Sequence, residues 1–172
     1  IDTTINTFLS SLRNLFGVEI FFAITLFGEI FAVVFLAILA SLFLWRKHLK
    51  KEIMALWVAV IGSSATTYLL KIIIDRPRPV DAVILEDSAS FPSGHATAAV
   101  AFYGFIIYLL LNYIKNIHYR VLTALAGVVI ILLIGFSRLY LGVHYFSDVL
   151  VGYLIGLLWL IIGIGYNRYK NK

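Results

Sequence analysis

Two histidines and one aspartate stand at spacings that suit nucleophilic catalysis. His144 and Asp148 are four residues apart in "HYFSD", so on a helix beginning near Gly142 their side chains share one face. A carboxylate so placed can hold one imidazole nitrogen as N–H and leave the other as a free lone pair. His95 follows the turn "PSG" and opens an apolar run. We therefore expect His144 to act as a nucleophile and His95 to transfer protons.

Cationic side chains occur near the same ends of the apolar segments. Lys71, Arg78 and Arg138 are positively charged, and the arginine guanidinium group matches phosphate oxygens in geometry. Ser93 and Gly94 form a turn before an expected helix, whose first backbone N–H groups are free to donate. This combination predicts a phosphate site beside the histidines.

Several of these residues have other interpretations at this point. A single histidine in an apolar helix, such as His95, is often only a polar partner in packing. A His–Asp–His set could bind zinc, but three cations would repel a divalent ion, so we expect no metal and no other cofactor. Arg76, next to a loop, suits a contact with lipid headgroups better than catalysis. Glu29, inside an apolar segment, could be protonated, bonded to a neighbouring helix or placed in a lipid-accessible groove.

The composition indicates a membrane protein. The chain has 172 residues, of which 62% are hydrophobic and 13% are charged, more apolar surface than one soluble core of this length could bury. Cysteine is absent, which excludes disulfides and thiolate chemistry. Apolar segments long enough to cross a hydrocarbon core of ~30 Å lie near residues 18–44, 52–74, 96–114, 121–137 and 146–166. The prediction is an all-α, polytopic transmembrane bundle with five visible spans, forming one membrane-embedded domain over residues 1–172.

Two further patterns have a structural meaning. Before the first span, apolar residues recur at helical spacing with polar residues between them, which predicts an amphipathic helix on the membrane surface. These residues are Ile5, Phe8, Leu9, Leu12 and Phe16. In the last span, Gly152 and Gly156 are spaced as GxxxG, which favours close packing of two helices.

Basic residues predict the orientation of the bundle. They cluster after the first, third and fifth spans, and these three places lie on one side of the membrane. The residues are Arg46, Lys47, Lys50, Lys51, Lys115, Arg120, Arg168, Lys170 and Lys172. By the positive-inside rule that side is cytoplasmic, so the net charge of +5 reflects orientation rather than nucleic-acid binding. The phosphate site then faces the extracytoplasmic side, and an N-terminus on that side leads us to expect a sixth span upstream of Ile1.

Three motifs follow one another along the chain. "KIIIDRPRP" holds Lys71 and Arg78, "PSGH" holds Ser93, Gly94 and His95, and "SRLYLGVHYFSD" holds Arg138, His144 and Asp148. In this order they resemble the signature of the type 2 phosphatidic acid phosphatase superfamily, which also includes glucose-6-phosphatases and vanadium haloperoxidases. The agreement has no departure within the motifs and covers about residues 1–168.

The resemblance implies a fold and a set of roles. The fold is a helical membrane bundle, usually of six spans, with a metal-independent site on the extracytoplasmic side. His144 would carry a phosphohistidine intermediate, Asp148 would orient it, and His95 would act first as acid and then as base. The residues that would hold the phosphoryl oxygens are Lys71, Arg78, Ser93, Gly94 and Arg138.

For the substrate, the resemblance leads us to expect a phosphorylated lipid. Bacterial relatives act on phosphatidylglycerol phosphate, undecaprenyl diphosphate, phosphatidic acid or lipid A phosphates, and an outward-facing site favours the first two. The lipid would enter sideways between helices, and we infer no obligatory protein partner. The alternatives are a phosphotransferase that passes the group from His144 to an alcohol, and a catalytically silent lipid-binding or transport protein. The intact histidines and Asp148 argue against a silent protein.

Overall fold

Helices and their connections make up the whole of residues 1–169, the part of the chain that the computed structural model describes. The elements are α1 (Asp2–Ser11), α2 (Leu15–Thr25), the 3-10 helix η1 (Leu26–Gly28), α3 (Ile30–Arg46), α4 (Lys50–Ile74), α5 (Gly94–Tyr113), α6 (Ile117–Tyr140) and α7 (Phe146–Tyr169). The expected all-α membrane bundle is confirmed. Lys170 and Lys172, which we assigned to a basic cluster, lie outside the described residues.

Four helices, α4 to α7, are each long and apolar enough to cross a membrane. The apolar run near residues 18–44, expected as one span, is divided into α2 with η1 and α3, which are bent by 49° at Glu29. Glu29 has an extended backbone (φ −63°, ψ 138°) and precedes the first residue of α3. By length and composition the described chain therefore has four spans, or five if the bent pair is one span. Glu29 stands out in the sequence of this segment, but the break itself was not predicted.

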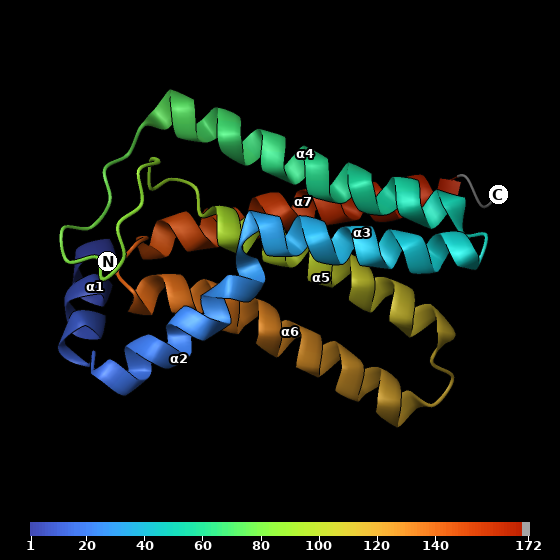
Figure 1. Ribbon diagram of the computed structural model, residues 1–172, viewed down its shortest axis with the longest axis horizontal. Coiled ribbons are helices and arrows are strands. Elements are labelled where there is room, and N and C mark those ends of the chain that lie inside the picture. Colours follow the sequence, from blue (N-terminus) through green and yellow to red (C-terminus); the bar gives the residue numbers. More distant parts are fainter. Residues whose placement is uncertain (170–172) are drawn as a thin grey trace.

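The amphipathic segment at the N-terminus is shorter than expected. α1 ends at Ser11, and the side chain of Asn14 caps the next helix by accepting from the N–H of Gly17 at 2.8 Å. Phe16 therefore belongs to α2. Leu9 is buried in α1, in a cluster with residues of α5, α6 and α7, so α1 closes one end of the bundle (Figure 1). The location of α1 on a membrane surface stays a prediction.

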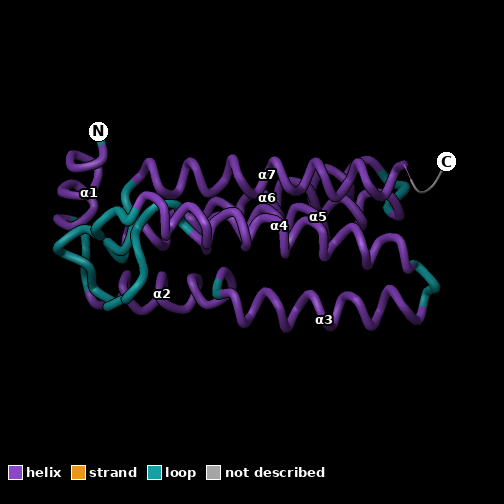
Figure 2. Tube along the Cα trace, turned by 90° about the horizontal axis from the view of Figure 1, so that it is seen from above, coloured by secondary structure: helices purple, strands orange, loops and turns teal. Residues whose placement is uncertain are grey.

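α5 is the central helix of the bundle, and it packs against α4, α6 and α7. α2 and α3 lie along one side of these helices (Figure 2). The predicted close packing at the GxxxG pair is confirmed, with α5 as the partner. A Cβ atom on Gly152 would lie 2.7 Å from the carbonyl oxygen of Ser93, and one on Gly156 would lie 2.6 Å from that of Thr97. These glycines therefore let α7 approach the backbone of α5.

The two ends of the bundle differ in what they carry. The α3–α4 and α5–α6 connections lie at the end where α7 finishes, and they bring the described basic clusters together there (Figure 1). α1, the 75–93 loop and the α6–α7 turn lie at the opposite end. The predicted division of loops between the two ends is thus confirmed, and the residues singled out for chemistry lie at the second end.

Candidate active site

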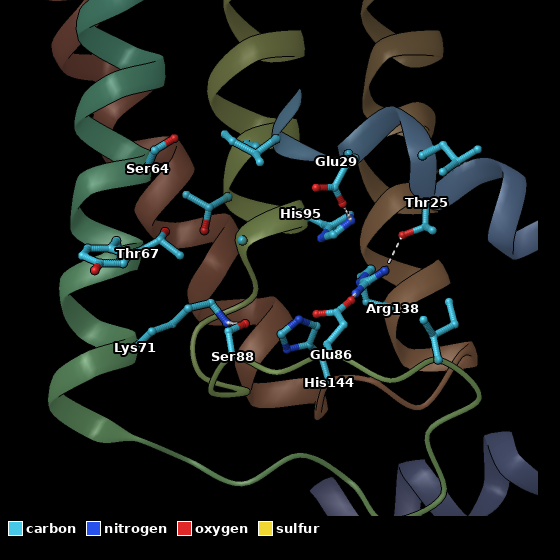
Figure 3. Close-up of a pocket in the computed structure, with 18 of the residues that line it drawn as sticks. Thr25, Glu29, Ser64, Thr67, Lys71, Glu86, Ser88, His95, Arg138 and His144 are labelled. Atoms are coloured by element: carbon cyan, nitrogen blue, oxygen red, sulfur yellow. Dashed lines mark hydrogen bonds and ion pairs between the residues drawn. The ribbon is translucent and has the colours of Figure 1, made fainter. Parts of the chain in front are cut away.

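A cavity of about 740 Å³ opens at the end of the bundle that carries the 75–93 loop. Its polar lining comes from α2, the Glu29 break, α4, the 75–93 loop, α5, α6 and the α6–α7 turn (Figure 3). These residues include Thr25, Glu29, Thr67, Lys71, Glu86, Ser88, His95, Arg138 and His144. Side chains from all three sequence motifs therefore meet at one cavity.

His144 lies in the turn between α6 and α7, which Gly142 makes possible through its left-handed backbone (φ +69°). The helix begins at Phe146, two residues after His144, rather than near Gly142 as expected. His144 and Asp148 nevertheless lie close together, because the Asp148 carboxylate lies over the residues that precede α7. It accepts from the N–H of Tyr145 at 2.8 Å, and its Oδ2 atom lies 3.5 Å from His144 Nδ1.

The environment of His144 keeps its imidazole neutral. The pKa of His144 is lowered to about 3: burial has the largest effect, the cations Arg138, Arg78 and Lys71 act in the same direction, and Asp148 opposes them. Nδ1 is buried without a hydrogen bond among the described residues, and Asp148 is the acceptor placed nearest to it. Nε2 lies 3.3 Å from a guanidinium nitrogen of Arg78. The second ring nitrogen therefore faces the cationic part of the site.

Asp148 is completely buried, and its charge is compensated from two further directions. Arg76 donates to Oδ1 at 2.6 Å, and the hydroxyl of Ser90 donates to Oδ2. Arg76 also pairs with Asp2 at 2.9 Å and lies over the ring of Tyr145. Arg76 is thus engaged by two carboxylates although its side chain is 29% exposed, a role that the headgroup interpretation did not foresee. Ser90 was missed, since nothing in the sequence distinguishes it from the other serines of its loop.

The three predicted cations converge from separate elements. Lys71 comes from the last turn of α4, which ends where Asp75 adopts a left-handed backbone before Arg76 and Pro77. Its ammonium donates to the carbonyl of Ala89. Arg78 donates to the carbonyl of Val143 at 2.6 Å, next to His144. Arg138, buried in the last turn of α6, donates to Thr25 at 2.7 Å. These bonds fix three positive groups around the cavity.

Glu86 lies between two of these cations. One carboxylate oxygen is 2.7 Å from Arg78, and the other forms an ion pair with Arg138. Burial alone would raise the pKa of Glu86, but Arg138 and Arg78 bring it below its ordinary value, so the side chain is an anion at neutral pH. Sequence reasoning missed this residue, whose only signal is that it is one of several acids in the loop that carries Arg78.

Ser93 and Gly94 stand at the start of α5, as expected. Ser93 precedes the first helical residue without forming a side-chain cap, and its buried hydroxyl has no hydrogen-bond partner among the described residues. Its backbone N–H donates to the carbonyl of Asp148 at 3.0 Å, which ties the turn to the residue that lies against His144. His95 follows, with Nε2 3.2 Å from a carboxylate oxygen of Glu29. The structure thus brings all eight predicted site residues to this end of the bundle.

Comparisons with known proteins agree with this arrangement. Residues 52–172 match the model of the PAP2 superfamily. Phosphatidylglycerophosphatase B of Bacillus subtilis (strain 168) is 36% identical over 141 residues, which cover 77% of this chain and 68% of the relative.

Two solved structures have the same fold. The first is a crystal structure of a transmembrane PAP2-type phosphatidylglycerolphosphate phosphatase from Bacillus subtilis, with a TM-score of 0.88 and 30% identity over 98% of this chain and 85% of that one. The second is Aquifex aeolicus LpxE, with a TM-score of 0.72 and 26% identity over 96% of this chain and 95% of that one. The resemblance inferred from the three motifs is confirmed: the chain belongs to the PAP2 superfamily and is a multi-pass membrane lipid phosphatase.

Proposed function

We propose that the protein hydrolyses the terminal phosphomonoester of phosphatidylglycerol phosphate through a phosphohistidine intermediate on His144. The observation that carries the proposal is the placement of the two ring nitrogens of this neutral histidine. Nδ1 faces the carboxylate of Asp148, and Nε2 faces Arg78 at the phosphate site. The similarity to phosphatidylglycerophosphatase B of Bacillus subtilis supports the choice of substrate.

In the first step, Nε2 of His144 attacks phosphorus and the bond from phosphorus to the lipid oxygen breaks. His95 donates a proton to that oxygen, so the lipid leaves as an alcohol. Asp148 stabilises the positive charge that develops on the imidazole. In the second step, His95 accepts a proton from water, the hydroxyl oxygen bonds to phosphorus, and His144 is released together with inorganic phosphate.

The charge on the phosphoryl group is met by fixed donors. Lys71 and Arg138 line the cavity together with Gly94, the first residue of α5, and Arg78 lies 3.3 Å from Nε2 of His144. Ser93, just before Gly94, has a buried hydroxyl without a hydrogen-bond partner among the described residues. Preorganised positive groups of this kind are the main requirement of phosphoryl transfer. We propose that these donors act without a metal ion.

The lipid reaches the site from the bilayer at the extracytoplasmic face. Leu26 and Tyr68 line the cavity and are 50% and 66% exposed, so an acyl chain can lie between the α2–α3 bend and α4. The opposite end of the bundle carries the described basic residues of the α3–α4 and α5–α6 connections, which favour the cytoplasmic side. The arginines at the site end are instead paired with acidic groups.

The test is release of inorganic phosphate by the purified protein in detergent, with and without EDTA. The panel holds phosphatidylglycerol phosphate, undecaprenyl diphosphate and phosphatidic acid, with His144→Ala as the blank. We expect phosphate to be released fastest from phosphatidylglycerol phosphate, and this release should continue in the presence of EDTA. His144→Ala should release no phosphate and should form no acid-labile phosphoenzyme. Faster release from another lipid would contradict phosphatidylglycerol phosphate as the substrate. Loss of phosphate release in EDTA would contradict the metal-free mechanism. Phosphate that appears on an added alcohol instead of in solution would identify a transferase.

A further inference from the structure

The bend between α2 and α3 places a carboxylate against the proposed acid–base residue. Glu29 interrupts the apolar helix with an extended backbone, and its side chain lines the cavity. Its Oε2 atom lies 3.2 Å from Nε2 of His95. An ionisable residue at this depth in a membrane helix is costly unless it has a partner, and His95 is that partner.

The backbone around Glu29 is shaped for this contact. A Cβ atom on Gly28 would lie 3.2 Å from both Cβ and Cδ2 of His95, so the absence of a side chain lets the bend approach the imidazole. Tyr103, on the same helix as His95, donates to the carbonyl of Phe27 at 2.8 Å and holds the bend in place. The contact between Glu29 and His95 is therefore fixed by backbone packing on both sides.

The two nitrogens of His95 have different surroundings. Nε2 faces Glu29, whereas Nδ1 takes part in none of the hydrogen bonds found among the described residues. Figure 3 shows Glu29 and His144 on opposite sides of the His95 ring. The nitrogen that Glu29 does not hold is thus left for the substrate. His144 has the same arrangement, with Asp148 on one nitrogen and the phosphate site on the other.

We propose that Glu29 is a positioning residue for His95: its carboxylate holds the imidazole through Nε2, fixes Nδ1 as the proton-transferring nitrogen and stabilises the protonated ring. The inference rests on the proposed role of His95. The other charged groups that act on His95 are Arg138 of α6 and Glu86 of the 75–93 loop. Glu86 is engaged by Arg78 and Arg138, so Glu29 is the carboxylate that contacts the imidazole directly.

The effect of Glu29 should depend on the leaving group. An aliphatic alkoxide is a poor leaving group and needs the proton from His95, whereas 4-nitrophenolate leaves without one. The parameter kcat/KM covers the steps up to the first irreversible one, which is formation of the phosphoenzyme. A residue that acts through His95 therefore changes kcat/KM for an alkyl phosphate and spares the aryl phosphate. A residue that only supports the fold changes both.

The experiment measures kcat/KM for octyl phosphate and 4-nitrophenyl phosphate with the wild type, Glu29→Gln, Glu29→Asp, His95→Ala and the control Glu19→Gln. Glu19 is an exposed acid on α2, the helix that leads into the same bend. We expect Glu29→Gln to lose ~10- to 100-fold with the alkyl ester, the range found when a partner that orients a functional imidazole is removed. The loss with the aryl ester should be at most about threefold, the alkaline limb of the alkyl profile should move to lower pH, and Glu29→Asp should regain part of the activity.

The outcomes separate this inference from the mechanism on which it rests. If His95→Ala lowers the rates for both esters equally, the acid role of His95 fails, and the role of Glu29 fails with it. If His95→Ala is selective for the alkyl ester and Glu29→Gln is not, only the inference about Glu29 is overturned. If Glu29→Gln does not fold, Glu29→Asp decides: a selective loss with the alkyl ester supports the inference, and equal losses or none overturn it.

Discussion

The carboxylate of Glu86 lies 2.7 Å from the guanidinium of Arg78 and occupies the position between the two arginines proposed to hold phosphate. Because Arg138 and Arg78 lower the pKa of Glu86 against the effect of its burial, the side chain stays ionised to a lower pH than an ordinary glutamate. A phosphoryl group therefore has to displace it from the arginines before it can bind them. The loop that supplies Arg78 also supplies the competitor.

Replacing Glu86 should strengthen phosphate binding. In Glu86→Gln the side chain keeps its size and loses its charge, so we expect KM for the lipid and the inhibition constant for vanadate to fall together by about three- to tenfold, a coupling of roughly 1 kcal/mol. The measurement is the steady-state rate over a range of substrate and vanadate concentrations. Asp87→Asn, a change of the neighbouring acid of the same loop, is the matched control. A higher KM in Glu86→Gln would mean that Glu86 orders the arginines rather than competing for them.

The contact between α5 and α7 should be sensitive to single methyl groups. Gly156→Ala places a Cβ atom 2.7 Å from Cβ of Val100 and 2.6 Å from the carbonyl oxygen of Thr97, so the helices must separate. Overpacking of this kind costs ~1–3 kcal/mol, which should appear as a lower midpoint of thermal unfolding in detergent. Gly165→Ala on the same helix meets nothing within 4 Å and should leave the midpoint unchanged. Equal midpoints for the two variants would contradict the close packing.

The sequence predicted the chemistry of the site better than the elements that support it. Lys71, His95 and His144 were found because charged and imidazole groups at the ends of apolar segments require an explanation. The break at Glu29 was not found, because the contact that Glu29 makes there is with His95 on another helix rather than with a neighbour in the sequence. Glu86 and Ser90 were missed for a similar reason. They lie in an irregular loop, where no periodicity relates a position in the sequence to a direction in space.

Arg76 should matter for catalysis, although the sequence favoured a contact with lipid headgroups for it. It forms an ion pair with the buried Asp148 and also reaches Asp2, so Arg76→Gln leaves the Asp148 carboxylate without a cationic partner. Breaking such a pair costs up to ~3–5 kcal/mol when both partners are buried, and less here because Arg76 is partly exposed. We expect a lower unfolding midpoint and a kcat reduced by about tenfold. Arg46→Gln, at the opposite end of the bundle, is the control. Equal kcat values in the two variants would show that Arg76 does not contribute to catalysis.

The buried His144 should make stability depend on pH in a defined direction. Its pKa is lowered from the ordinary value of 6.5 to about 3, so between these values the unfolded chain binds a proton that the folded chain excludes. The stabilisation associated with neutral His144 is complete above pH 6.5 and is lost progressively as pH falls towards 3.

His144→Asn removes the titrating group. The unfolding midpoint of the wild type, relative to that of the variant, should therefore be higher at pH 7.5 than at pH 4.5. Ser93→Ala, a buried change in the same site that removes no titrating group, should show the same difference from the wild type at both pH values. If the midpoint difference between the wild type and His144→Asn does not change with pH, the imidazole is protonated as readily in the folded protein as in the unfolded chain. The proposal that His144 is a neutral nucleophile would then be wrong.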